Sequence, residues 1–179
     1  MDVVSQKRPA AWLYLSAGFT LLELISSLAI MSILIGVALP FFSDVIDRQN
    51  LNTDSMAIRR ALSYARMAAI TRQERIIVCH WDGTNGCSGN SARYSYQWSN
   101  GLLIFNDPDE NKTLNSEGET VLRVMPFTGQ TEIYWGKGEV VAFRNDGQSP
   151  GYNSTFTMQS GDYEAKLILS MTGRLRNGK

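Results

Sequence analysis

The chain has 179 residues, of which 44% are apolar and 19% are charged. This length suits one domain of ordinary size with an additional terminal segment. The composition excludes a disordered chain and a protein that lies wholly within a membrane. Lysine and arginine together number 17, as do aspartate and glutamate, so the formal net charge is zero. Because there is no overall basic excess, any surface that binds nucleic acid must be local.

A long apolar run, residues 19–42, lies near the N-terminus, and Glu23 is its only charged residue. At a rise of about 1.5 Å per residue, this run makes a helix of roughly 36 Å, which is enough to cross a hydrocarbon layer of about 30 Å. Lys7 and Arg8 precede the run. Positive charge on that side predicts a cytoplasmic N-terminus. We therefore predict a single-pass membrane protein whose C-terminal part lies on the opposite side of the membrane from the N-terminus.

Small residues precede this apolar run instead of following it. In an ordinary secretory signal, the cleavage site comes after a short apolar core, whereas here residues 16–18 come before the long one. Residues 18–23 read Gly-Phe-Thr-Leu-Leu-Glu, which resembles the processing signal of type IV pilins and pseudopilins. The resemblance implies that a prepilin peptidase cleaves between Gly18 and Phe19 and that Phe19 is N-methylated. It also implies that Glu23 is the signature glutamate of the family.

The helical pattern continues beyond Pro40 in amphipathic form. A stripe of mostly apolar residues recurs at steps of three and four, the spacing of one helix face. The stripe consists of Leu51, Ser55, Ile58, Leu62, Ala65 and Ala69, and Arg48, Asp54, Arg59, Arg66 and Arg72 lie off it. We predict a helix from about Phe19 to Thr71, bent or locally melted at Pro40 because proline removes a backbone hydrogen bond. Its second half, residues 43–72, is expected to pack on a sheet.

From Arg75 onward the pattern changes to short runs rich in β-branched and aromatic residues. These runs are 75–80, 93–98, 101–105, 120–125, 139–143, 154–158 and 165–170, with Gly, Asn, Asp and Pro between them. Seven or eight short strands at this spacing predict antiparallel sheets. The predicted fold is therefore α+β, with a long N-terminal helix packed on antiparallel β-sheets in a C-terminal domain of residues 73–179.

The order of motifs within this C-terminal domain carries a second resemblance. The motifs are VCHWDGTNGC, Trp98-x-x-Gly101, LLIFND, VLR, VVAFRNDG and a terminal TGRLR. Their order resembles that of the GspH/FimT/FimU branch of minor pilins and pseudopilins, and FimT most of all. The resemblance implies the type IV pilin fold, with a leader of residues 1–18 and a filament-core helix of residues 19–42. It also implies assembly with other major and minor pilins by an inner-membrane platform, first in the bacterial inner membrane and then in an extracellular pilus, with the C-terminal domain initially periplasmic.

Glu23 is costly in hydrocarbon unless its charge is compensated. One interpretation is a polar residue that is tolerated near the membrane edge. We favour the other, in which Glu23 pairs with the N-terminal amine of a Phe19 in a filament subunit. Such a pair would cancel both charges and favour docking at the correct axial register.

Cys79 and Cys87 close a short, flexible loop downstream of the apolar run. In the periplasm an oxidising environment favours disulfides, so we predict a structural disulfide between these two residues.

The sequence favours neither a metal site nor a cofactor. His80 is the sole histidine, and it forms no recognised ligand spacing with Cys79; we interpret it as a surface residue. Residues 107–111 imitate the start of a calcium loop, but the sixth position is Lys112 instead of Gly, and the twelfth is Gly118 instead of Glu. A solvated turn is the favoured interpretation.

The last fourteen residues are basic. They contain Lys166, Arg174, Arg176 and Lys179 and no acidic side chain, and Glu164 lies just before them. If TGRLR forms a strand, its period of two places Arg174 and Arg176 on one face and turns Leu175 to the core. Lys166, on the preceding strand, extends that stripe. Side chains so arranged contact DNA phosphates without reading sequence, and Gly173-Arg174-Leu175-Arg176 resembles the G-R-x-R signature of DNA-binding FimT-type pilins.

Two functions remain open. We favour a minor pilin that binds extracellular double-stranded DNA through the C-terminal strand, for uptake in natural transformation. The alternative is a structural minor pilin or pseudopilin that primes pilus assembly or serves type II secretion, in which charges merely keep an edge strand soluble. An adhesin has no specific residue in its favour. Catalysis is not expected, because the sequence shows no phosphate-binding loop, metalloprotease motif or His-containing triad.

Overall fold

A computed structural model describes residues 19–84, 86–87, 91–92, 95–98, 100–115 and 118–178. The chain divides into two compact units, Met1–Pro40 and Phe41–Lys179. A single helix, α1 (Leu21–Arg72), has residues in both. The predicted leader, with Gly18, and the predicted DNA contact at Lys179 lie outside the described residues.

Helix α1 begins where Thr20 caps it. The Thr20 hydroxyl accepts a hydrogen bond from the Glu23 amide at 3.2 Å, which is the arrangement of a helix N-cap. Glu23 also places a negative charge in the first turn, where the helix dipole favours it. All side chains of residues 19–36 are exposed. Within the part of the chain that the structure describes, no helix is both long enough and apolar enough to cross a membrane.

A bend or local melting was predicted at Pro40; the helix continues through this residue, so it does not melt there, and the bend stays a prediction. Proline removes one hydrogen bond from the ladder, and the bonds of the neighbouring turns sustain the helix across it. Beyond this point the predicted amphipathic stripe is confirmed: Ile58, Leu62 and Ala65 are all at most 1% exposed. Asp54, predicted to lie off the stripe, is nevertheless buried, because its carboxylate accepts hydrogen bonds from the amide and hydroxyl of Thr128 at 2.9 and 2.7 Å.

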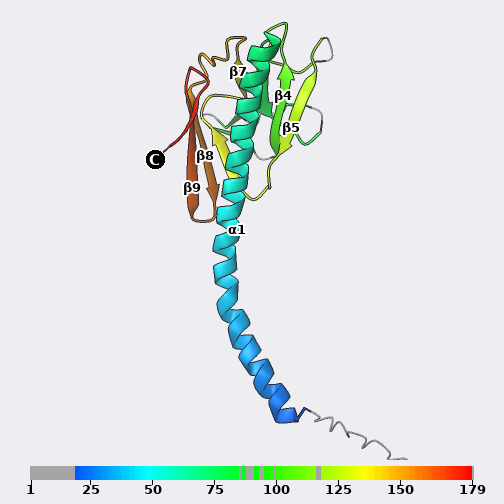
Figure 1. Ribbon diagram of the computed structural model, residues 1–179, viewed down its shortest axis with the longest axis vertical. Helices are drawn as coiled ribbons and strands as arrows, with labels where there is room; N and C mark the ends of the chain where they lie inside the picture. The colour runs from blue at the N-terminus through cyan, green and yellow to red at the C-terminus, as the bar shows by residue number, and fades with distance from the viewer. Residues whose placement is uncertain are drawn as a thin grey trace, which may run out of the picture. The chain divides into compact units, whose positions relative to one another are not determined.

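The C-terminal unit contains two antiparallel sheets, as predicted (Figure 1). The first has the order β5-β4-β1-β7 and consists of β5 (Val121–Pro126), β4 (Gly101–Asn106), β1 (Ile76–His80) and β7 (Val140–Phe143). The second has the order β10-β9-β8-β6-β3-β2 and consists of β10 (Leu175–Asn177), β9 (Tyr163–Leu169), β8 (Ser154–Ser160), β6 (Glu132–Trp135), β3 (Ser95–Gln97) and β2 (Ser91–Ala92).

Three of these strands depart from the sequence prediction. Among the described residues of the run predicted as one strand, 93–98, β3 covers 95–97, and β2 lies before the run. Strand β6 was not anticipated, because its four residues stand between loops and are too short to show a clear alternation.

Strands β1 and β4 are buried along their whole length because side chains cover both faces of the first sheet. On one face, Ile76 and Leu102 pack in the main core with the second half of α1. On the other, Ile77, Leu103 and Phe105 form a smaller cluster. Burial on both faces explains why these strands read as continuous apolar runs.

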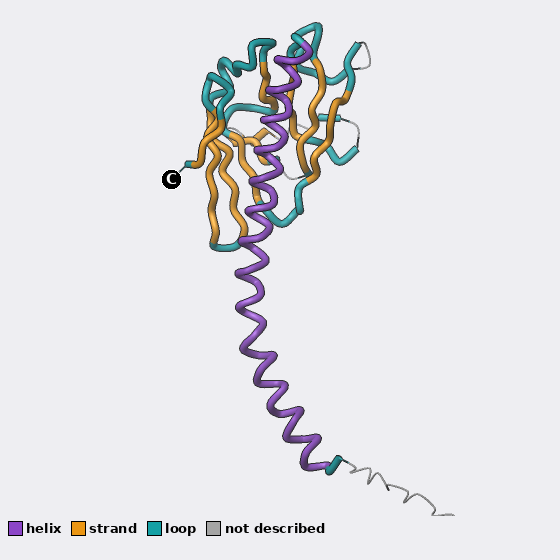
Figure 2. Tube along the Cα trace, viewed as in Figure 1, coloured by secondary structure: helices purple, strands orange, loops and turns teal. Residues whose placement is uncertain are grey.

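The main core also joins α1 to the second sheet. Phe156, Met158, Leu167 and Leu169 point inward from β8 and β9 and pack in the same cluster as the helix. Within the C-terminal unit the helix therefore covers one face of both sheets, as the purple helix and orange strands of Figure 2 show.

Candidate functional site

The turn between β9 and β10 carries Arg174 and is closed by hydrogen bonds between its two ends. The amide of Ser170 donates to the carbonyl of Arg174 at 2.9 Å, and the amide of Arg174 donates to the Ser170 hydroxyl at 3.1 Å. Gly173 lies between them with φ of +73°, and a Cβ there would overlap the carbonyl oxygen of Gly147. Only glycine fits such a left-handed, closely approached position. This turn therefore fixes the backbone position of Arg174.

Arg174 and Arg176 are both exposed, but they do not lie on the same strand, as had been predicted. Strand β10 begins only at Leu175, which is half-buried against the core, so Arg174 belongs to the turn. Arg176 lies opposite Ile168 of β9. Neither arginine forms an ion pair with another described residue.

Lys166 was predicted to extend the basic stripe, and in the structure its ammonium group pairs with the carboxylate of Glu164. The two residues lie two apart on β9, and the period of two places them on the same face of the strand. Both side chains are exposed, and such a surface pair is weak, so a role of Lys166 in DNA binding stays a prediction.

Arg174 instead faces a cleft of about 540 Å³ between the second half of α1 and the C-terminal turn. The cleft is lined by Arg59, Ser63, Arg66, Met67, Ile70, Gly173, Arg174 and Leu175. Arg59 also donates a hydrogen bond to the side-chain oxygen of Asn177. Sequence reasoning missed Arg59 and Arg66 as partners of Arg174. Their separation of seven residues, two helical turns, was the available signal that they share a helix face.

The predicted disulfide between Cys79 and Cys87 is present, with the two Cα atoms 5.7 Å apart. The loop that it closes is held by Asp82, whose carboxylate accepts hydrogen bonds from the amides of Thr84 and Gly86 at 2.7 and 3.1 Å. The hydrogen bond from the Thr84 amide is the main reason that the pKa of Asp82 lies below its ordinary value. The disulfide and these bonds give the loop a structural role.

The interpretation of His80 as a surface residue is wrong. Its side chain is 4% exposed, because β1 lies inside the first sheet. Its Nε2 atom accepts a hydrogen bond from the amide of Asn100 at 3.3 Å, and its ring stacks near that of Trp98 at 6.3 Å between centroids. The histidine is thus part of the packed interior.

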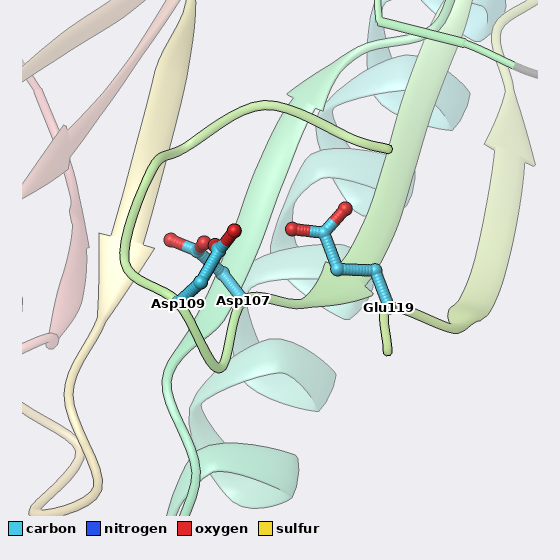
Figure 3. A group of neighbouring side chains, drawn as sticks. All are labelled: Asp107, Asp109 and Glu119. Atoms are coloured by element: carbon cyan, nitrogen blue, oxygen red, sulfur yellow. The ribbon is translucent and has the colours of Figure 1, made fainter. Parts of the chain in front are cut away.

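Three carboxylates gather where the two ends of the loop between β4 and β5 meet. Ligand atoms of Asp107, Asp109 and Glu119 lie within 4.8 Å of one another, and Figure 3 shows Glu119 directed toward the two aspartates. Oxygen ligands of this kind suit a divalent cation. Sequence reasoning missed Glu119 because it falls one position beyond the expected end of a calcium loop.

Asp107 already has partners and is fully buried, whereas residues 108–111 are exposed, as the interpretation of this stretch as a solvated turn predicted. Arg75 Nε lies 3.4 Å from its Oδ2 atom, and the Lys112 amide donates to both of its oxygens at 3.3 Å. Burial raises the pKa of Asp107 above its ordinary value, although the Lys112 amide and the Arg75 charge oppose the rise. These contacts account for Asp107 without a metal ion, and the expected absence of a metal stays a prediction.

At the other end of the described chain, Phe19 is 83% exposed, and the side chain of Glu23 is exposed as well. Glu23 forms no ion pair within the described residues. Its predicted pairing with the N-terminus of a filament subunit, and the processing of Phe19, stay predictions.

Comparisons with known proteins give a family and a fold. The family model for type II transport protein GspH matches residues 54–173. A crystal structure of the type IV minor pilin FimU from Pseudomonas aeruginosa, in space group P21, is 20% identical with a TM-score of 0.52, covering 74% of this chain and 90% of that chain. A second crystal form, in space group P65, is 19% identical with a TM-score of 0.43, covering 73% and 90%. No curated protein sequence matches this chain.

Proposed function

The chain belongs to the GspH family, and from this premise we propose that it is a minor subunit of a type IV pilus or of a related pseudopilus. The arrangement of helix and antiparallel sheets is that of a type IV minor pilin. Both the family and the fold point to a structural subunit, so the proposal assigns the chain no catalytic role. The subunit would associate with other pilins and be anchored in the bacterial inner membrane before assembly.

The observation that carries this proposal is the apolar surface of the first half of α1. Large apolar side chains between Phe19 and Ile35 are 53–83% exposed. Such a surface is unfavourable in water, and it suits a lipid bilayer or the apolar helices of neighbouring subunits. The serine hydroxyls of this segment donate to carbonyls three residues earlier, Ser26 to Glu23 at 3.0 Å and Ser32 to Ala29 at 2.8 Å. These hydroxyl groups therefore need no hydrogen bond to water.

In this proposal a prepilin peptidase removes residues 1–18, and Phe19 becomes the methylated N-terminus. Glu23 then pairs with the N-terminal amine of a Phe19 in the filament. The charge of Glu23 stands alone on an apolar surface, since it has no ion-pair partner among the described residues, and an apolar filament interior would favour its neutralisation.

Replacement of Glu23 tests this assembly step. Glu23→Ala and Glu23→Val should leave membrane insertion intact and reduce the amount of subunit in sheared filaments, measured by immunoblotting of membrane and filament fractions. Ser26→Ala, an uncharged change one turn away, is the matched control and should assemble normally. Normal assembly of both Glu23 variants would contradict the pairing.

A second function, DNA binding in natural transformation, is favoured by Arg174 and Arg176. Both are exposed and without ion pairs among the described residues, and guanidinium groups in that state can contact phosphates of double-stranded DNA. The alternative is that these charges serve only to keep the edge strand β10 soluble. Under that alternative, the chain would be a structural minor pilin or a type II secretion pseudopilin without a ligand of its own.

DNA binding can be measured with the full-length protein in detergent at low salt. The double variant Arg174→Ala plus Arg176→Ala should weaken binding by about tenfold or more, and added salt should weaken wild-type binding steeply. The control Lys112→Ala plus Lys137→Ala removes two exposed lysines elsewhere and should have a much smaller effect. Absence of wild-type binding at low salt would eliminate DNA binding and leave the structural subunit.

A further inference from the structure

The cleft between the second half of α1 and the C-terminal turn is lined by Arg59 and Arg66, which neither filament anchoring nor DNA binding requires, and by Arg174, which the DNA-binding proposal also uses. We propose that this cleft receives an acidic side chain, Asp or Glu, from a neighbouring subunit of the filament. The proposal rests on the proposed function, because the acidic residue is supplied by another pilin. It concerns Arg59, Arg66 and Arg174, whereas Arg176 does not line the cleft.

Charge is the first argument. Three arginines line one cleft, no carboxylate is among its lining residues, and none of the three forms an ion pair within the described chain, although Arg59 donates a hydrogen bond to Asn177. Like charges that line one cleft repel one another. A carboxylate that enters the cleft compensates this charge, and the planar fork of arginine matches its two oxygens.

The position of Arg66 is the second argument. Its side-chain carbons lie against the backbone of the neighbouring turns, because a Cβ added at Gly173 or Gly147 would be 3.3 Å from them. The Nε atom of Arg66 is buried and has no hydrogen-bond partner within the described chain. An unpaired buried donor is unfavourable, so the side chain of Arg66 keeps a hydrogen-bonding capacity that the described chain does not use.

The remaining lining favours a protein over a DNA duplex. Met67 is 64% exposed and Ile70 is 41% exposed, and together with Leu175 they place apolar surface beside the guanidinium groups. The methylene groups of a glutamate and the apolar side chains around it can cover this surface, as in ordinary protein interfaces. A duplex backbone offers mainly charged phosphates and sugars, which match the apolar side chains of Met67 and Ile70 less well than protein side chains do.

Photo-cross-linking in assembled filaments tests the proposal. In the full chain, expressed in bacteria that form the filament, Met67 is replaced by a photoreactive phenylalanine analogue. After irradiation of the sheared filaments, mass spectrometry identifies the attached peptide. We expect a segment of another filament subunit that contains Asp or Glu.

Charge reversal then tests the electrostatic basis of the contact. Arg174→Glu should lower the yield of that cross-link by about tenfold, and replacement of the identified acid by Arg in the partner should restore it. Arg66→Gln, which keeps a long polar side chain, should lower the yield without a charge reversal. Lys137→Glu, an exposed charge reversal outside the cleft, is the control. Unfolding curves of each variant show whether the fold is retained.

The outcomes separate this inference from the proposed function. A cross-link to DNA, to a segment without an acidic residue, or to nothing, in filaments that contain the chain, would overturn the inference and leave the proposed function standing. A yield unchanged by Arg174→Glu would overturn it as well. If the unaltered chain is absent from filaments, both the inference and the proposed function fail.

Discussion

The two halves of helix α1 relate to their surroundings in opposite ways. Between Phe19 and Ile35 the large apolar side chains are 53–83% exposed, whereas Ile58, Leu62 and the other apolar stripe residues of the second half are at most 8% exposed. In the second half the chain covers one helix face with its own sheets, so burial there contributes to folding. In the first half the apolar side chains are left exposed by the described residues, and under the proposed function lipid or other subunits would cover them. Under that proposal, apolar residues of one helix serve folding in one segment and assembly in the other.

Truncation of one leucine in each half should give the largest contrast. Leu62 is 1% exposed, and Leu62→Ala should destabilise the C-terminal unit by about 2–5 kcal/mol because it leaves a cavity. Leu28 is 58% exposed, and Leu28→Ala should change that stability by less than about 0.5 kcal/mol. Denaturant unfolding of the full chain in detergent, followed by the fluorescence of buried Trp98 and Trp135, measures both. Equal losses of unfolding free energy in the two variants would contradict the contrast between the two halves of α1.

Substitution of two glycines tests how tightly the C-terminal turn is packed in the C-terminal unit. Gly173 and Gly129 have similar left-handed φ angles, +73° and +77°, but a Cβ at Gly129 meets no atom within 4 Å. Gly129→Ala should therefore cost only the backbone strain, about 1 kcal/mol. Gly173→Ala should cost about 1–3 kcal/mol more, because it also pushes against Gly147. The same unfolding measurement gives the difference, and identical costs would show that the turn is not closely packed.

The smallest expected effect is in the pH dependence of the C-terminal unit. The pKa of Asp107 is raised above 3.8 by burial, so its stabilising contribution is complete below that pH and is lost as pH rises through the folded-state pKa. The pKa of Asp82 is lowered, chiefly by the Thr84 amide, so its contribution is present above 3.8 and is lost as pH falls through its folded-state pKa. Asp107→Asn and Asp82→Asn should change the slope of stability against pH in opposite directions. Unfolding curves from about pH 3 to about pH 7 test the signs.

Much of this architecture follows from local patterns in the sequence. Steps of three and four residues predicted the face that carries Ile58 and Leu62, and short runs rich in β-branched and aromatic residues between turn residues predicted antiparallel sheets. The short separation of Cys79 and Cys87 predicted the disulfide. In each case neighbouring residues of the chain carry the physical cause.

Features that depend on contacts between distant segments could not be read in this way. Arg59 and Arg66 join Arg174 only because the C-terminal turn docks on the helix, and Asp54 is buried only because Thr128 reaches it. His80 is buried because β1 is an inner strand, and strand order is not a local property. The pairing of Lys166 with Glu164 differs from these, since period-two alternation along β9 could have revealed it.

The central claim is that the chain is a processed subunit of a surface filament. Mass spectrometry of the chain isolated from the filament fraction tests it most directly. The account predicts a protein that begins with N-methylated Phe19 and lacks residues 1–18. Absence of the chain from the filament fraction, or a filament-associated chain that retains those residues, would contradict the claim.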